Sequence, residues 1–289
     1  MHPTLLGCDF SSSPSRRKPV VLAVGHCEGR LGAQRVQLER FLTFDNLPAL
    51  GAHLAQPGPW VGGFDFPFGL PRELVEALAW PTEWLACMRH YAALSRHEIR
   101  SAFAAFCDSR PAGAKFAHRA TDCPAGSSPS MKWVNPPVAF MLHAGVPLLL
   151  QAGVCLPGLH PVPPVVSGPE PSQCVALEAY PGLLARSVLG HRSYKSDTKA
   201  KQTADRLIAR KDLADALDTG RAPLLAQAGL RIKWSHAQRE AAVDDASGDH
   251  MDAVLCLLQA AWGWQQHQLG HPKYGLPDFD PLEGWIVTA

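Results

Sequence analysis

The chain has 289 residues, of which 46% are hydrophobic and 18% are charged, and its formal net charge is +1. This length suits one large domain or two ordinary ones, and the hydrophobic content is that of a globular protein rather than a disordered one. The near-neutral charge excludes a global field that would attract nucleic acids or an anionic membrane, so any nucleic-acid contact depends on local basic residues.

The sequence also disfavours a membrane protein, a secreted protein and a zinc protein. No apolar run approaches the roughly 20 residues that a membrane span needs. The chain starts directly in a strand pattern without a signal peptide, so we expect a cytoplasmic location. The eight cysteines include no C-x-x-C spacing and lie mostly in apolar runs, which favours reduced thiols over disulfides or structural zinc.

The first two elements form a predicted hairpin, with apolar strands over 5–10 and 19–24. Asp9 lies at the tip of the first strand, within an otherwise apolar run. A buried lone carboxylate is costly, so such an aspartate is usually paired, bound to a metal or facing a cleft. The alternative is that Asp9 only starts the turn by accepting from the N–H groups of Ser11 or Ser12.

Alternation over 34–41 predicts a third strand, and together the three strands make an antiparallel meander. A helix follows over 47–54, with Asp45 or Asn46 as its N-cap. The next apolar strand, over 60–66, carries a single acid, Asp65, and is expected to run parallel to an earlier strand because it follows a helical crossover.

Residues 72–136 are predicted to form an insertion around the site, with helices over 72–106 and turn-rich basic loops over 107–136. We expect Lys115, Arg119 and Lys132 to contact substrate phosphates. As surface residues, Lys115 and Arg119 should tolerate alanine with a stability change of about 0.5 kcal/mol or less. The alternative is a packed surface loop anchored by Trp133.

Residues 138–150 are expected to pass from a helix into a strand, and six prolines over 157–171 indicate a surface crossing. A further strand over 174–180 carries Glu178, and a helix then runs from Pro181 to Gly190. The basic stretch over 195–212 is either a solvated helix face or a phosphate-facing one. On the second interpretation, Lys195 binds substrate.

The last large element is a nearly all-apolar helix over 251–262, with Asp249 and Asp252 on one face of its N-terminal end. Asp249 can serve as a cap, whereas Asp252 lies inside the buried helix and needs a charge partner.

Four apolar elements therefore each deliver carboxylate groups, from Asp9, Asp65, Glu178 and the pair Asp249/Asp252. Converging like charges require cations, and oxygen ligands select Mg²⁺ or Mn²⁺. Two such ions about 4 Å apart are suited to phosphoryl transfer, so we expect this cluster to bind two divalent cations.

The order of these elements and acids resembles the ribonuclease H-like superfamily, in particular its resolvase-type members. More closely, the chain resembles an uncharacterised bacterial family of predicted ribonuclease H-like nucleases. The resemblance spans nearly the whole chain and is carried by GCDFS (7–11), FDFPFGLP (64–71), LEAYP (177–181), GDHMDA (248–253) and EGWI (283–286). Resolvases usually have Glu where this chain has Asp65.

The resemblance implies a single α/β domain over 1–289, with a mixed sheet of about five strands flanked by helices. It implies a nuclease acting on DNA or RNA. Its catalytic metal ligands would be Asp9, Asp65, Glu178 and Asp252, with Asp249 beside them. Two other classes stay open: a non-catalytic nucleic-acid or nucleotide-binding protein of this fold, and a phosphotransferase or ATPase of the actin-like group. The second would need a glycine-rich phosphate loop, and residues 11–18 contain no glycine.

Overall fold

A six-stranded mixed β-sheet forms the centre of the computed structural model, which describes residues 3–161 and 173–289. The strand order is β5-β4-β1-β2-β3-β6, in which β2 is antiparallel to both β1 and β3 and the other neighbours are parallel. The strands are β1 Thr4–Asp9, β2 Val20–Glu28, β3 Gln34–Phe44, β4 Trp60–Phe64, β5 Cys174–Glu178 and β6 Leu230–Lys233. The predicted α/β class is confirmed, and β6 is a strand that the sequence did not predict.

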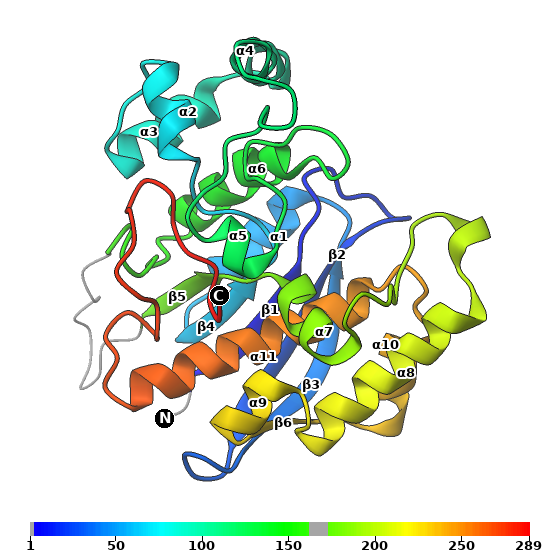
Figure 1. Ribbon diagram of the computed structural model, residues 1–289. Coiled ribbons are helices and arrows are strands. Elements are labelled where there is room, and N and C mark those ends of the chain that lie inside the picture. Colours follow the sequence, from blue (N-terminus) through cyan, green and yellow to red (C-terminus); the bar gives the residue numbers. More distant parts are fainter. Residues whose placement is uncertain (1–2, 162–172) are drawn as a thin grey trace.

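Alternate residues of the strands enter two separate hydrophobic cores, one on each face of the sheet. Leu5 belongs to one core and Leu6 to the other, as strand geometry requires. The first core is completed by α7 Pro181–Leu189, α8 Ala204–Thr219, α9 Pro223–Ala228, α10 His236–Asp244 and α11 Asp249–Gln268. The second is completed by α1 Leu47–Leu54, α2 Arg72–Ala77, α3 Trp84–Ala93, α4 Arg96–Asp108 and α6 Val138–Gln151 (Figure 1).

The buried helix α11 lies directly against the centre of the sheet (Figure 1). A side chain at Gly7 of β1 would overlap the carbonyl oxygen of Ala253, and one at Gly63 of β4 would overlap that of Cys256. The two glycines therefore let the helix backbone touch the strands. This contact fixes the first turn of α11 beside the carboxyl ends of β1 and β4.

The order of helices and strands departs from expectation over 138–150. That stretch is helical throughout α6, with Pro147 inside the helix, so the expected passage into a strand there is wrong. A continuous apolar run does not distinguish a buried helix from a buried strand by its period, which is why the sequence misled.

The insertion over 72–136 consists of α2, α3, α4, the short α5 Asp122–Ala125 and connecting loops. Of the two residues expected to cap α1, Asn46 does so by accepting from the Ala49 N–H at 2.9 Å. The proline-rich crossing over 157–171 lies largely outside the described residues. Over the described ranges, no helix combines the length and apolar character that crossing a membrane would require.

Candidate metal centre

Asp9, Asp65 and Asp252 form a carboxylate triad in which one oxygen of each residue lies within 4.8 Å of the others. Asp9 ends β1, Asp65 directly follows β4, and Asp252 lies in the first turn of α11. Over residues 3–161 and 173–289, no other group of three or more His, Cys, Asp or Glu residues has metal-binding geometry.

The parallel pairing of β1 and β4 brings the first two acids together. Cys8 is paired with Phe64, and the Asp65 N–H donates to the Cys8 carbonyl at 3.0 Å. The next residues, Asp9 and Asp65, therefore lie side by side at the carboxyl ends of the two strands. Asp252 joins them because α11 rests on Gly7 and Gly63, and its N–H donates to the Gly248 carbonyl at 2.8 Å.

The carboxylates of the two strand-end acids receive no hydrogen bond from the residues that the structure describes. Within the described chain neither Asp9 nor Asp65 accepts a side-chain hydrogen bond, so the alternative in which Asp9 accepts from Ser11 or Ser12 is not seen. Burial raises the pKa of Asp65 to about 7, with the charges of Asp252 and Glu178 adding to the effect and Lys195 opposing it. Burial, followed by the charges of Asp252 and Asp249, raises the pKa of Asp9 well above its usual range.

Asp252, by contrast, is fully buried and has partners within the chain. The Lys195 ammonium pairs with one carboxylate oxygen and the Tyr194 hydroxyl donates to the other. The charge partner that the sequence required for Asp252 is therefore Lys195. Burial lowers the pKa of Lys195, but Asp252 and the neighbouring acids more than offset this and raise it well above its usual value.

Glu178, at the end of β5, lies near the triad but outside it. The residue is 4% exposed, and its two oxygens accept from Arg119 at 2.6 and 2.8 Å. The Phe68 N–H donates to the same carboxylate at 2.9 Å. Arg119 also pairs with Asp122 at 2.9 Å. Glu178 therefore already has a cationic partner within the protein, which it shares with Asp122.

The positions of the four predicted substrate-binding cations differ from one another. Arg119 is only 2% exposed, so the expectation that it is a surface residue tolerant of alanine is wrong. A turn-rich sequence gives no burial pattern, which is why the error arose. Lys115 is exposed and Lys132 is half-buried, and neither lines the cleft described below. Lys195 lines the cleft and contacts the triad.

The predicted acid Asp249 opens α11 and also lines the cleft, but Gly248 rather than Asp249 is the N-cap. Burial and the charge of Asp245 raise the pKa of Asp249, while Lys18 opposes them.

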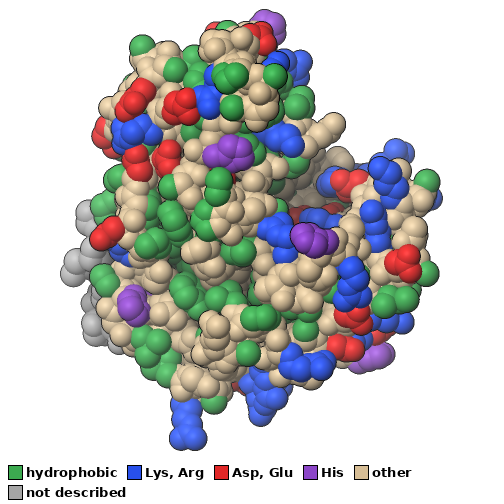
Figure 2. Space-filling view, viewed as in Figure 1, with side chains coloured by type: hydrophobic (Ala, Val, Ile, Leu, Met, Phe, Trp, Pro, Cys, Tyr) green, Lys and Arg blue, Asp and Glu red, His purple; other side chains and the backbone are tan. Residues whose placement is uncertain are grey.

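Asp9 and Asp65 line a cleft of about 930 Å³ between the insertion and the segment that precedes α8, and Asp252 is buried beside them. Figure 2 shows this face of the molecule hollowed between the upper helices and the α8 side, with acidic and basic side chains along the hollow. Basic residues from both sides line it: Lys18, Arg96, Arg119, Arg186, Arg192 and Lys195. An apolar wall comes from Phe10, Phe66, Phe140 and Met141.

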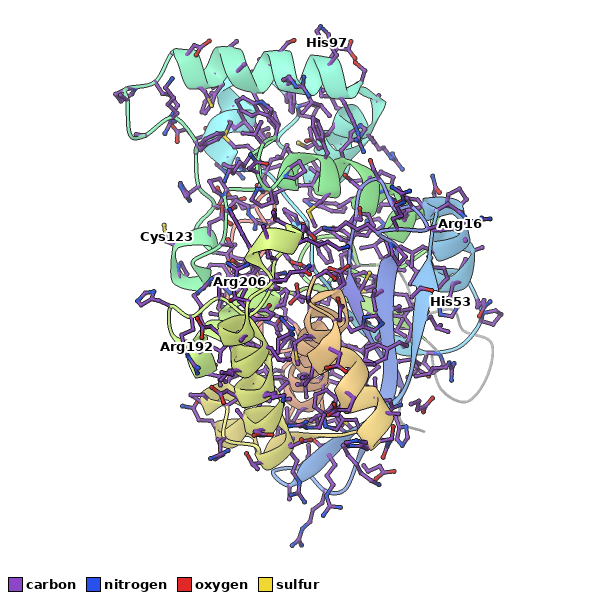
Figure 3. The ribbon with its side chains drawn as sticks, turned by 90° about the vertical axis from the view of Figure 1, so that its right-hand side faces the viewer. Arg16, His53, His97, Cys123, Arg192 and Arg206 are labelled. Atoms are coloured by element: carbon purple, nitrogen blue, oxygen red, sulfur yellow. The ribbon has the colours of Figure 1, made fainter. Side chains whose placement is uncertain are left out.

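The sequence did not identify Tyr194, Lys18, Arg96, Arg186 and Arg192 as cleft residues. Among these residues, only Tyr194 had a feature in the sequence that could have indicated a cleft position, namely its place beside Lys195 before a basic helix. The others are isolated basic residues that only the fold brings to one opening. Arg192 lies on the side of the molecule that carries α8 (Figure 3).

The donor set fits a hard divalent cation. The triad offers only carboxylate oxygens, two of its members have no partner from the described chain, and no histidine or cysteine belongs to it. Such ligands suit Mg²⁺ or Mn²⁺ and do not favour zinc.

The chain matches no family model, no curated protein and no solved structure.

Proposed function

We propose that this protein is a Mg²⁺- or Mn²⁺-dependent phosphodiester hydrolase, a nuclease acting on DNA or RNA. The observation that carries the proposal is the pair of unpartnered carboxylates, Asp9 and Asp65, beside Asp252 at a cleft with basic walls. Three converging acids are unfavourable unless a cation compensates them.

The chain's own residues suit this chemistry. Asp9, Asp65 and Asp252 would hold the metal, with Asp249 at the edge of the centre. A bound divalent cation would supply Lewis-acid activation and charge neutralisation at a phosphate. Lys18, Arg96 and Arg192 line the cleft and would bind the phosphates that flank the scissile bond.

We also propose that the fold is ribonuclease H-like. The support is the order of elements along the chain: a meander of three strands, a helix, a parallel strand, a later parallel strand and a C-terminal acidic helix. The placement of single acids at the ends of β1, β4 and β5 supports the same proposal.

The test is cleavage of labelled single-stranded, double-stranded and branched DNA and RNA in Mg²⁺, Mn²⁺ or chelator. We expect metal-dependent cleavage that Asp9→Asn lowers by about 100-fold or more, the scale of removing one strong electrostatic contact from a catalytic site. Asp108→Asn is the matched control, since Asp108 is exposed at the end of α4 and distant in sequence from every triad acid.

Binding of nucleic acid without cleavage in either metal would contradict the enzyme and favour a binding protein of the same architecture. Cleavage that persists unchanged in Asp9→Asn would show that the activity belongs to another site or to a contaminant.

A further inference from the structure

Lys195 lines the cleft, and its ammonium group reaches the carboxylate centre. It pairs with Asp252, a residue with no solvent exposure, and its charge also acts on Asp9 and Asp65. Tyr194 donates to the other Asp252 oxygen. Both oxygens of Asp252 therefore have a donor from the chain, whereas Asp9 and Asp65 have none among the described residues.

The backbone around Lys195 is held by several hydrogen bonds, none of which involves the triad. Arg210 donates to the Tyr194 carbonyl at 2.7 Å, and Arg206 donates to the Lys195 carbonyl at 2.9 Å. The Ser196 N–H donates to the Ala246 carbonyl at 3.0 Å. Arg210 is 4% exposed, and Arg206 projects from the first turn of α8 (Figure 3). These contacts hold the lysine in place before any ligand binds.

The turn before α11 also accommodates the lysine. Gly248 has φ of +84°, and a Cβ there would lie 2.7 Å from the Lys195 Cβ and 2.9 Å from its Cδ. The position therefore requires glycine both for its left-handed backbone and for the approach of the lysine stem. The loop that starts α11 and the segment that carries Lys195 are built to fit each other.

The number of carboxylates in the centre exceeds the number of positive side chains that pair with them. Arg119 pairs with Glu178 and Asp122 outside the triad, and Lys18 opposes the charge of Asp249 at its edge, while the triad itself carries three carboxylates. Lys195 balances one of them, and a single divalent cation balances the other two. A second divalent cation would bring excess positive charge close to the ammonium group.

We propose that Lys195 is the built-in second cation of this centre, so that the site binds one divalent metal ion, through Asp9 and Asp65 with Asp252, instead of two. This inference rests on the proposed metal-dependent function and specifies how its centre is charged. Lys195 is thus a positioning and charge-compensating residue for the metal.

The experiment is calorimetric titration of the metal-free full-length protein with Mn²⁺, comparing wild type, Lys195→Met, Lys195→Arg and Lys199→Met. Wild type should bind one ion per chain. Lys195→Met removes a positive charge beside the metal and should tighten Mn²⁺ binding by at least about tenfold. It should also lower the metal-free melting temperature, because it removes the compensating charge. Lys195→Arg should stay close to wild type in affinity, and Lys199→Met, an exposed lysine four residues away, should be unchanged.

A purely structural lysine would destabilise the protein when replaced but would not tighten metal binding. Two ions per wild-type chain, or unchanged or weaker Mn²⁺ binding in a folded Lys195→Met, would overturn the inference while leaving the metal-dependent function intact. The stoichiometry of wild type decides the matter even if Lys195→Met does not fold. No Mn²⁺ binding by wild type would overturn both the inference and the proposed metal centre.

Discussion

The acids at the ends of three parallel strands differ in whether the protein supplies a cation for them. At the end of β5, Glu178 is buried, and the protein supplies Arg119 to balance it. At the ends of β1 and β4, Asp9 and Asp65 are partly buried and receive no donor within the described chain. The sequence pattern is identical in the three strands, a single acid at the end of an apolar run. The first region is therefore complete without a ligand, and the second is organised to receive one.

Breaking the completed region should give the largest effect on stability. Arg119→Met leaves Glu178 and Asp122 buried without their common cation, so we expect the free energy of unfolding to fall by about 3–5 kcal/mol. Urea denaturation of the metal-free protein would measure the loss.

The double variant Arg119→Met/Glu178→Gln tests the cause. It removes the stranded charge and should recover part of the loss, since breaking a buried pair costs more than replacing both partners. A loss below about 1 kcal/mol in Arg119→Met would mean that Glu178 finds another partner, and the contrast between the two regions would disappear.

This contrast also marks how far the sequence could predict the structure. Five of the expected strands are present because each is an apolar or alternating run bounded by turn residues, whereas the one expected within 138–150 is part of a helix. β6 was missed because only Leu230 and Ile232 of its four residues are apolar. Strand-end position predicted which acids approach one another. The position of an acid at a strand end could not predict which cation pairs with it, because Arg119 lies 59 residues before Glu178 in a stretch without hydrophobic periodicity.

The incomplete region should make the metal-free protein less stable as the pH rises. The folded-state pKa of Asp65 is about 7, against an ordinary value of about 4, so the folded chain holds more protons than the unfolded chain between these limits. The free energy of unfolding should therefore fall by about 1–2 kcal/mol from pH 5 to pH 8 in chelator. Chemical denaturation at a series of pH values would measure it.

Two variants and bound Mn²⁺ test whether the triad causes this dependence of the free energy of unfolding on pH. Asp65→Asn removes an unpartnered charge at nearly constant shape, so it should flatten the decline and raise metal-free stability at pH 8. Asp252→Asn, the matched change, should instead be destabilising, because it removes the charge that pairs with Lys195 and leaves one acceptor oxygen where Lys195 and Tyr194 use two. Saturating Mn²⁺ should flatten the wild-type profile, since a ligand at 100 times its dissociation constant contributes about 2.7 kcal/mol to the folded state. An Asp65→Asn profile as steep as that of wild type would assign the pH dependence to other groups.

Removing an exposed ion pair at the mouth of the cleft should have the smallest effect on stability. Lys18 pairs with Asp197 at 2.7 Å, but their side chains are 49% and 67% exposed, whereas those of Arg119 and Glu178 are almost fully buried. An exposed pair contributes little, so Lys18→Met should change the free energy of unfolding by about 0.5 kcal/mol or less.

Because the pair is weak, Lys18 is free to exchange Asp197 for a substrate phosphate. Nucleic-acid affinity should therefore fall, and the slope of log affinity against log salt should become shallower by about one. Fluorescence anisotropy over a salt series would measure both the affinity and the salt dependence.

Lys273→Met is the matched control, since Lys273 makes an exposed pair with Asp278 at the same 2.7 Å and does not line the cleft. If the two variants reduced affinity equally, the cleft would not be the nucleic-acid site. If Lys18→Met instead cost several kcal/mol, the rim would be structural in the same way as the Arg119–Glu178 pair.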